Sequence, residues 1–266
     1  MSTNSFWASE LGLRVVSAIV MLIFTIGISV IGGWPFALFC AAISLLVFYE
    51  WQKMVSVTPF DVPEVILTVG FLFIVAGALF GFFWWALIAF LIVGLVLELI
   101  SKGEERSEIL WIGLGALYCA IPVFALPLVR EVGGIDVLFL LFFVVWATDI
   151  GAYFAGRKFG GPKVLPSVSP KKTWSGAIGG ALAAIIFAYV VAQISPELGI
   201  WPAMILALVL SVVSQMGDFF ESWVKRLHNV KDSSNLIPGH GGVLDRVDGL
   251  VTAALVLALW LALGAS

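Results

Sequence analysis

The sequence has 266 residues, of which 61% are hydrophobic and only 12% are charged. Its mean hydropathy of +1.10 excludes a soluble globular domain, because much of the surface of such a domain has to be wetted by water. The formal net charge of −3 gives no indication of a nucleic-acid partner.

Long apolar stretches follow one another along the whole chain. A transmembrane helix needs about 20 mostly apolar residues, and the sequence contains about nine such stretches. They lie roughly at 14–32, 34–50, 64–82, 83–100, 109–129, 136–155, 174–194, 200–217 and 247–264. We therefore expect an all-α, polytopic integral membrane protein with about nine transmembrane helices, embedded among membrane lipids.

The basic residues fall on one side of these predicted spans. When the loops are assigned alternately to the two sides, Arg130 is the only one of the 14 Lys and Arg residues on its side. Cytoplasmic loops of membrane proteins carry an excess of Lys and Arg. We therefore expect a cytoplasmic N-terminus and a C-terminus outside the cytoplasm.

The two halves of the chain differ in chemistry, although we expect them to form one integrated membrane domain. Residues 1–135 carry few ionisable groups inside their spans and are interpreted as a scaffold. Glu50 and Glu98 lie at span ends, where anchoring at the membrane surface is the favoured interpretation. Residues 136–266 carry the candidate site, which faces the cytoplasm.

Asp149 lies inside the span predicted at 136–155. An ionisable residue at that depth is a candidate for function, and pairing with a neighbouring helix is the alternative. A basic loop rich in Gly and Pro follows and ends in Lys171, Lys172 and Thr173, at the start of the next helix. Free N–H groups and the helix dipole at such a start favour anions, so we predict that this segment binds phosphate.

The span predicted at 200–217 continues as a charged helix. Asp218, Ser222 and Lys225 are spaced i, i+4 and i+7, so they share one helical face, with Arg226 beside them. Such a stripe suits a metal ion and phosphate groups; the alternative is a solvated charged face. The acids and glycines that follow favour the first interpretation.

A glycine-rich loop with two further acids precedes the last span. His240 precedes Gly241 and Gly242, which allow the backbone to approach a ligand closely. His240 either contacts phosphate or caps the turn. Asp245 and Asp248, spaced i, i+3, can face one point. Together with Asp218 they offer carboxylate oxygens that suit Mg²⁺, which usually takes one or two carboxylates plus substrate phosphates.

This segment also resembles a known family. The pattern Ser222-x-x-Lys225-Arg226, Lys231-Asp232, Pro238-Gly-His-Gly-Gly and Asp245-Arg246-x-Asp248 is similar to the C-terminal signature of phosphatidate cytidylyltransferases, also called CDP-diacylglycerol synthases. The stretches beginning at Asp149 and at Ser169 resemble the same family, although its members more often have Glu at the position of Ser175.

The resemblance implies that CTP and phosphatidate give CDP-diacylglycerol and pyrophosphate with Mg²⁺, as one or two ions, in the cytoplasmic (inner) membrane of a bacterium. Asp218, Asp245 and Asp248 would hold the metal, and Asp149 and Lys225 would join them in catalysis. The predicted substrate-binding residues are Lys171, Lys172, Thr173, Ser222, Arg226, Lys231, His240, Gly241, Gly242 and Arg246.

Other functions stay open at this point. One is a CTP-dependent enzyme that acts on another lipid phosphate or on a lipid alcohol. Another is a secondary transporter with Asp149 as its coupling acid, which the one-sided charge and the lack of a sequence repeat disfavour. A homodimer is left open.

Overall fold

A computed structural model of the chain describes residues 10–56, 61–237 and 241–264. Within these residues the chain forms α-helices and contains no β-strand; most connections are short, and the longer loops precede α8 and α10. The elements are α1 (Glu10–Ile31), α2 (Gly33–Val55), α3 (Val62–Phe80), α4 (Phe83–Ile100), α5 (Gly103–Cys119), α6 (Ile121–Val132), α7 (Gly134–Phe159), α8 (Trp174–Ile194), the 3-10 helix η2 (Pro196–Leu198), α9 (Ile200–Leu227) and α10 (Leu244–Gly264).

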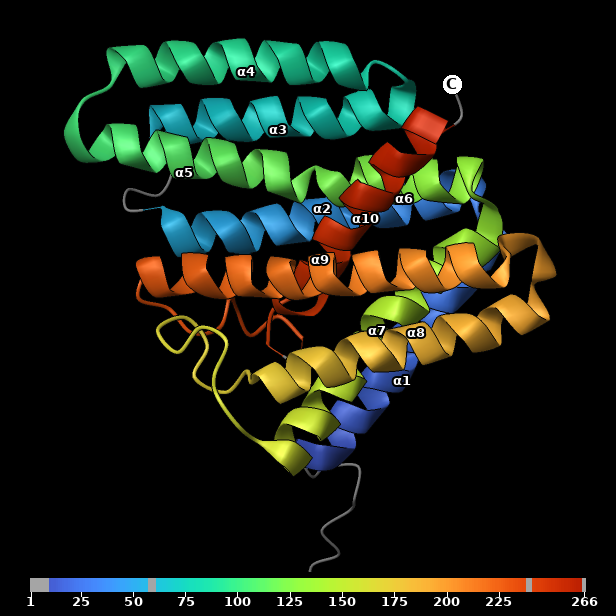
Figure 1. Cartoon of the computed structure of the whole chain (residues 1–266). Coiled ribbons are helices and arrows are strands. Elements are labelled where there is room, and N and C mark those ends of the chain that lie inside the picture. The colour runs from blue at the N-terminus through green and yellow to red at the C-terminus, as the bar shows by residue number, and fades with distance from the viewer. Residues whose placement is uncertain (1–9, 57–60, 238–240, 265–266) are drawn as a thin grey trace, which may run out of the picture. The chain divides into compact units, whose positions relative to one another are not determined.

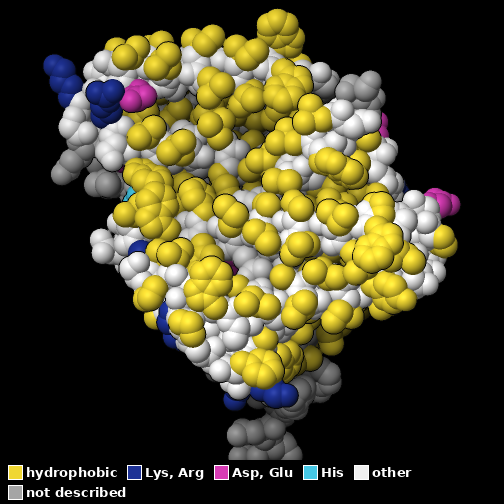
Figure 2. All heavy atoms as spheres, viewed as in Figure 1, with side chains coloured by type: hydrophobic (Ala, Val, Ile, Leu, Met, Phe, Trp, Pro, Cys, Tyr) yellow, Lys and Arg dark blue, Asp and Glu magenta, His cyan; other side chains and the backbone are white. Residues whose placement is uncertain are grey.

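The helices confirm the predicted class of fold. In the described part of the chain, eight helical stretches are long and apolar enough to cross a membrane. The remaining predicted span corresponds to α1, whose apolar part is the shorter stretch Val15–Ile31. Many large apolar side chains are exposed, and Figure 2 shows hydrophobic side chains over most of the visible face. Such a surface suits lipid hydrocarbon rather than water.

The span predicted at 109–129 is interrupted in the structure. Helix α5 ends at Cys119 and α6 begins at Ile121, while the stretch 106–132 as a whole stays apolar. Pro122 explains the break, because proline has no N–H to donate and its ring clashes with the carbonyl group four residues earlier.

The chain divides into two compact units. The first contains residues Met1–Pro127 and Asp232–Arg246. Figure 1 shows its helices α2, α3, α4 and α5 side by side. Trp51 of α2 is fully buried and donates its indole N–H to the carbonyl oxygen of Trp111 at 2.9 Å. Gly115 of α5 is needed beside this ring, because a Cβ there would overlap it.

The second unit contains residues Leu128–Lys231 and Val247–Ser266. Helix α8 packs against α7 and α9, as Figure 1 shows. Small residues permit the close approach of α7 and α8. A Cβ on Gly180 would lie 2.7 Å from the Thr148 carbonyl oxygen, and one on Gly179 would collide with Ala155. The run of small residues in α8 is therefore a packing surface, as is common between membrane helices.

Candidate functional site

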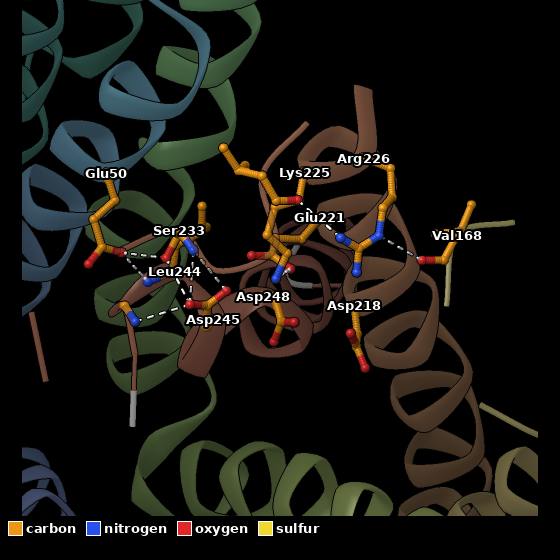
Figure 3. A network of polar contacts seen from close by, with 12 residues as sticks. Glu50, Val168, Asp218, Glu221, Lys225, Arg226, Ser233, Leu244, Asp245 and Asp248 are labelled. Carbon is orange, nitrogen blue, oxygen red and sulfur yellow. Dashed lines mark hydrogen bonds and ion pairs between the residues drawn. The ribbon is translucent and has the colours of Figure 1, made fainter. Parts of the chain in front are cut away.

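Three carboxylates of the second unit converge on one point. Asp218 and Glu221 lie on α9 and Asp248 lies on α10, and each offers an oxygen within 4.8 Å of the others. Figure 3 shows the three side chains around a common space. Glu221 is fully buried, whereas the other two are partly exposed.

Two glycines explain why the acids meet. Gly217 precedes Asp218, and a Cβ there would lie 2.8 Å from the backbone oxygen of Asp248. Gly249 follows Asp248, and a Cβ there would lie 3.0 Å from the backbone oxygen of Ser214. The backbones of α9 and α10 therefore approach closely at the residues next to the acids, which brings the carboxylates together.

Two lysines accompany the three acids. Lys172 pairs with Asp218, and its ammonium group also lies 4.5 Å from the centre of the Phe219 ring. Lys225 pairs with Glu221 at 2.6 Å and is itself buried, with 8% of its surface exposed. Lys172 and Lys225 thus lie directly beside the acids.

The carboxylate group fits a divalent cation. Its donors are hard oxygen atoms from three side chains within coordination reach of one ion. Asp149 of α7 is exposed, and its charge interacts with that of Asp248. Four acids that interact in this way repel one another, so a cation between them would lower their electrostatic energy.

Glu221 was missed by the sequence reasoning. It lies three residues after Asp218 and four before Lys225, so its spacing placed it on the same helical face. The i, i+3 spacing from Asp218 is the signal in the sequence that indicates this position. Ser222 is half-buried on α9, and its predicted role stays a prediction.

The basic loop before α8 has the predicted helix start. Thr173 is buried, and its hydroxyl oxygen accepts the N–H of Gly176 at 3.1 Å, which caps the helix. Ser175 donates its hydroxyl to the carbonyl oxygen of Gly160. Lys171 is exposed at this helix start, where N–H groups and an ammonium group are available to an anion.

Arg226 of α9 is hydrogen-bonded to residues of two loops. Its guanidinium group donates to the carbonyl oxygens of Val168 at 3.4 Å and of Val230 at 3.1 Å, as Figure 3 shows for Val168. The side chain is exposed, so donors remain available for phosphate. Lys231, also predicted to bind substrate, is exposed in the same unit.

Asp245 lies in the first unit and organises the loop before α10. Its carboxylate accepts the N–H of Gly242 at 3.0 Å and that of Ser233 at 3.1 Å. Gly241 has a φ of 85° and exchanges backbone hydrogen bonds with Ile237. Arg246 is exposed. The metal role of Asp245 and the substrate roles of the two glycines and Arg246 stay predictions, and His240 lies outside the described residues.

The interpretation of Glu50 from the sequence was wrong. Anchoring at the membrane surface was the favoured interpretation, but the side chain is fully buried. Its carboxylate accepts hydrogen bonds from Ser233, Ser234, Val243 and Leu244, as Figure 3 shows in part. The sequence could not reveal this contact, because 183 residues separate Glu50 from Ser233.

Comparison with known proteins extends these observations. The family described as the Cytidylyltransferase family matches residues 12–263. A phosphatidate cytidylyltransferase of Brucella suis biovar 1 (strain 1330) is 44% identical over 260 residues, which cover 95% of this chain and 93% of the relative. The phosphatidate cytidylyltransferase of Bacillus subtilis (strain 168) is 31% identical over 264 residues, with 94% and 97% covered. The similarity thus extends over both units.

Proposed function

The chain belongs to the cytidylyltransferase family, and we propose that it transfers the cytidylyl group of CTP to phosphatidate at the cluster of Asp218, Glu221 and Asp248. The products are CDP-diacylglycerol and pyrophosphate. The protein is a membrane-embedded nucleotidyltransferase, and its relatives of similar length are named for this reaction.

The observation that carries the proposal is the juxtaposition of three acids with two lysines. In the reaction, an oxygen of the phosphatidate phosphate forms a bond to the α-phosphorus of CTP. The bond from that phosphorus to the bridging oxygen of the β-phosphate breaks, and pyrophosphate leaves with the bonding electrons. The attacking phosphate is already ionised at neutral pH, so no strong general base is required, and the main barrier is repulsion between two anions.

The three carboxylates supply the ligands for a divalent cation, for which Mg²⁺ is our assignment. A bound Mg²⁺ would neutralise charge on the reacting phosphates and on the leaving pyrophosphate. Lys172 pairs with Asp218, and Lys225 pairs with Glu221. Both ammonium groups would offer a compact positive charge to phosphates bound at this cluster.

The helix start at α8 supports a phosphate site beside this cluster. Thr173 caps the helix, and Lys171 and Lys172 precede it. Arg226 on α9 contributes a guanidinium group with donors to spare. These residues would hold and orient the triphosphate, which keeps the α-phosphorus in line with the incoming lipid phosphate.

We place the site on the cytoplasmic side of a bacterial inner membrane. The support is the distribution of charge, since all Lys and Arg residues except Arg130 fall in loops assigned to one side. CTP is available on that side, and the phosphate of phosphatidate lies at the level of the headgroups of the inner leaflet.

A direct assay tests the proposal. Purified full-length protein in detergent is incubated with labelled CTP, phosphatidate and Mg²⁺, and the lipid product is separated by chromatography. We expect labelled CDP-diacylglycerol, no product in EDTA, and recovery when excess Mg²⁺ is added. Product formation at full rate in EDTA would contradict the metal assignment, and label on another lipid phosphate but not on phosphatidate would contradict the substrate.

A further inference from the structure

Glu50 joins a helix of the first unit to the loop that precedes α10. One carboxylate oxygen accepts the hydroxyl of Ser234 and the backbone N–H of Val243 at 2.9 Å. The other accepts the hydroxyl of Ser233 at 3.2 Å and the backbone N–H of Leu244 at 2.7 Å. All four donors belong to the segment 232–246, and all of these groups lie within the first unit.

The hydrogen bonds compensate the burial of the Glu50 carboxylate and place it at the start of α10. A carboxylate is costly to bury unless hydrogen bonds replace its water, and here four donors do so. Two of the donors are the N–H groups at the start of α10, which have no partner within the helix. Glu50 therefore caps α10 from another helix, and its negative charge lies at the positive end of the helix dipole.

The loop is shaped around this carboxylate. A Cβ on Gly242 would overlap the hydroxyl of Ser233 and would lie 2.7 Å from the nearer Glu50 oxygen. Ser233 also donates its backbone N–H to Asp245. A glycine at 242, two serines and two acids thus form one packed network that fixes where α10 begins.

From this network we infer that Glu50 is a positioning residue for cytidylyl transfer, which fixes the start of α10 and thereby the acids that this helix carries. Asp245 lies in the first turn of α10, and Asp248 follows it on the same helix. A displaced helix start moves both backbones. The inference rests on the proposed function for its catalytic part, whereas the anchoring itself is independent of it.

The test replaces the acceptor without changing the size of the side chain. Glu50→Gln keeps one oxygen but turns an N–H₂ group toward a backbone donor, which leaves an N–H of the α10 start unsatisfied. Glu108→Gln is the matched control, because Glu108 is also buried in the first unit and accepts a hydroxyl, that of Ser56 at 2.9 Å.

Two measurements report on the anchor. The first is the Mg²⁺ concentration that gives half-maximal rate. We expect Glu50→Gln to raise it about tenfold, as is typical when the support of metal ligands is weakened, and excess Mg²⁺ to restore much of the rate. The second is maleimide labelling of a cysteine introduced at Val243, which is 7% exposed; Glu50→Gln should accelerate this labelling about tenfold by releasing the loop. Cys40 and Cys119 are both buried, and the parent protein without the new cysteine gives their background.

The outcomes separate the two proposals. Unchanged labelling together with an unchanged Mg²⁺ requirement would overturn the inference, as would equal effects of Glu108→Gln. If Glu50→Gln does not fold, Ser234→Ala removes one of the four donors, and we expect it to change both measurements in the same direction by a smaller factor. A wild-type protein without cytidylyltransferase activity would refute the proposed function and the catalytic part of this inference, while the labelling still decides whether Glu50 anchors the loop.

Discussion

Replacing Asp248 by Asn should separate activity from stability. The charge of Asp248 interacts with those of Asp218, Glu221 and Asp149, all of which are acidic. Without a bound cation these charges oppose folding, so the neutral amide relieves repulsion. With a cation the same charge is a ligand, so its removal lowers the rate. The substitution is therefore expected to stabilise the metal-free protein and to inactivate the enzyme.

The distances between the acids set the size of the effect on stability. Unit charges within 4.8 Å of each other repel by at least about 3.5 kcal/mol at the effective dielectric constant of about 20 that suits such sites. Lys172 and Lys225 lie beside the same acids and cancel much of this, so we expect a net gain of about 1 kcal/mol and a Tm higher by about 2–4 °C. Loss of a ligand carboxylate weakens binding of the cation that would neutralise the phosphates, and a loss of about 4 kcal/mol of that stabilisation corresponds to a rate about a thousandfold lower.

The assay measures Tm in EDTA and the rate of CDP-diacylglycerol formation at saturating Mg²⁺. Asp136→Asn is the matched control. It makes the same chemical change in the same unit, at an exposed residue at the start of α7 that accepts the Ser195 hydroxyl. The control should retain its rate and gain no stability. A Tm for Asp248→Asn below that of the wild type, or a rate within tenfold of it, would refute the reasoning.

Three further substitutions test the neighbours of this site. Glu221→Gln should lower both the rate and the Tm in EDTA, because buried Lys225 loses the partner that it holds at 2.6 Å; a higher Tm in EDTA would contradict that pairing. Lys172→Met should raise the KM for CTP about tenfold and the KM for Mg²⁺ by less. Steady-state kinetics with both concentrations varied measure the two constants. A larger change in the KM for Mg²⁺ than in the KM for CTP would show that Lys172 only neutralises Asp218. Gly217→Val should destabilise the protein by about 1–3 kcal/mol in thermal unfolding and abolish activity, because its side chain would separate α9 from α10; an active variant of unchanged stability would show that the close approach is not required.

The helices were predictable because membrane spans depend on local composition. Each predicted span coincides with a helix or a helix pair, and the one break inside a span, between Cys119 and Ile121, lies beside Pro122. The start of α8 was also predictable, because Thr173 is a good cap and the preceding Gly and Pro residues oppose a helix. The orientation of the spans in the membrane stays a prediction.

The site was predictable only in part. Asp218 and Asp248 were predicted to face one point, and they lie close together because their helices meet at Gly217 and Gly249; their metal role stays a prediction. The structure shows the Asp245 carboxylate accepting backbone N–H groups of its loop. Spacing in the sequence could not distinguish this role from metal binding, because both roles use the same carboxylate. The hydrogen bonds of Glu50 could not be predicted from the sequence, because its partners lie in a loop far along the chain.

The most direct test of the central claim is the binding of a divalent cation by the three carboxylates. Mn²⁺ is a suitable probe, because it prefers the same oxygen ligands as Mg²⁺ and has a paramagnetic resonance signal that changes on binding. We expect purified wild-type protein in detergent to bind Mn²⁺ in competition with Mg²⁺, and Asp218→Asn, Glu221→Gln and Asp248→Asn each to weaken binding strongly, whereas Asp136→Asn does not. Equal Mn²⁺ binding by the wild type and the three site variants would contradict the account.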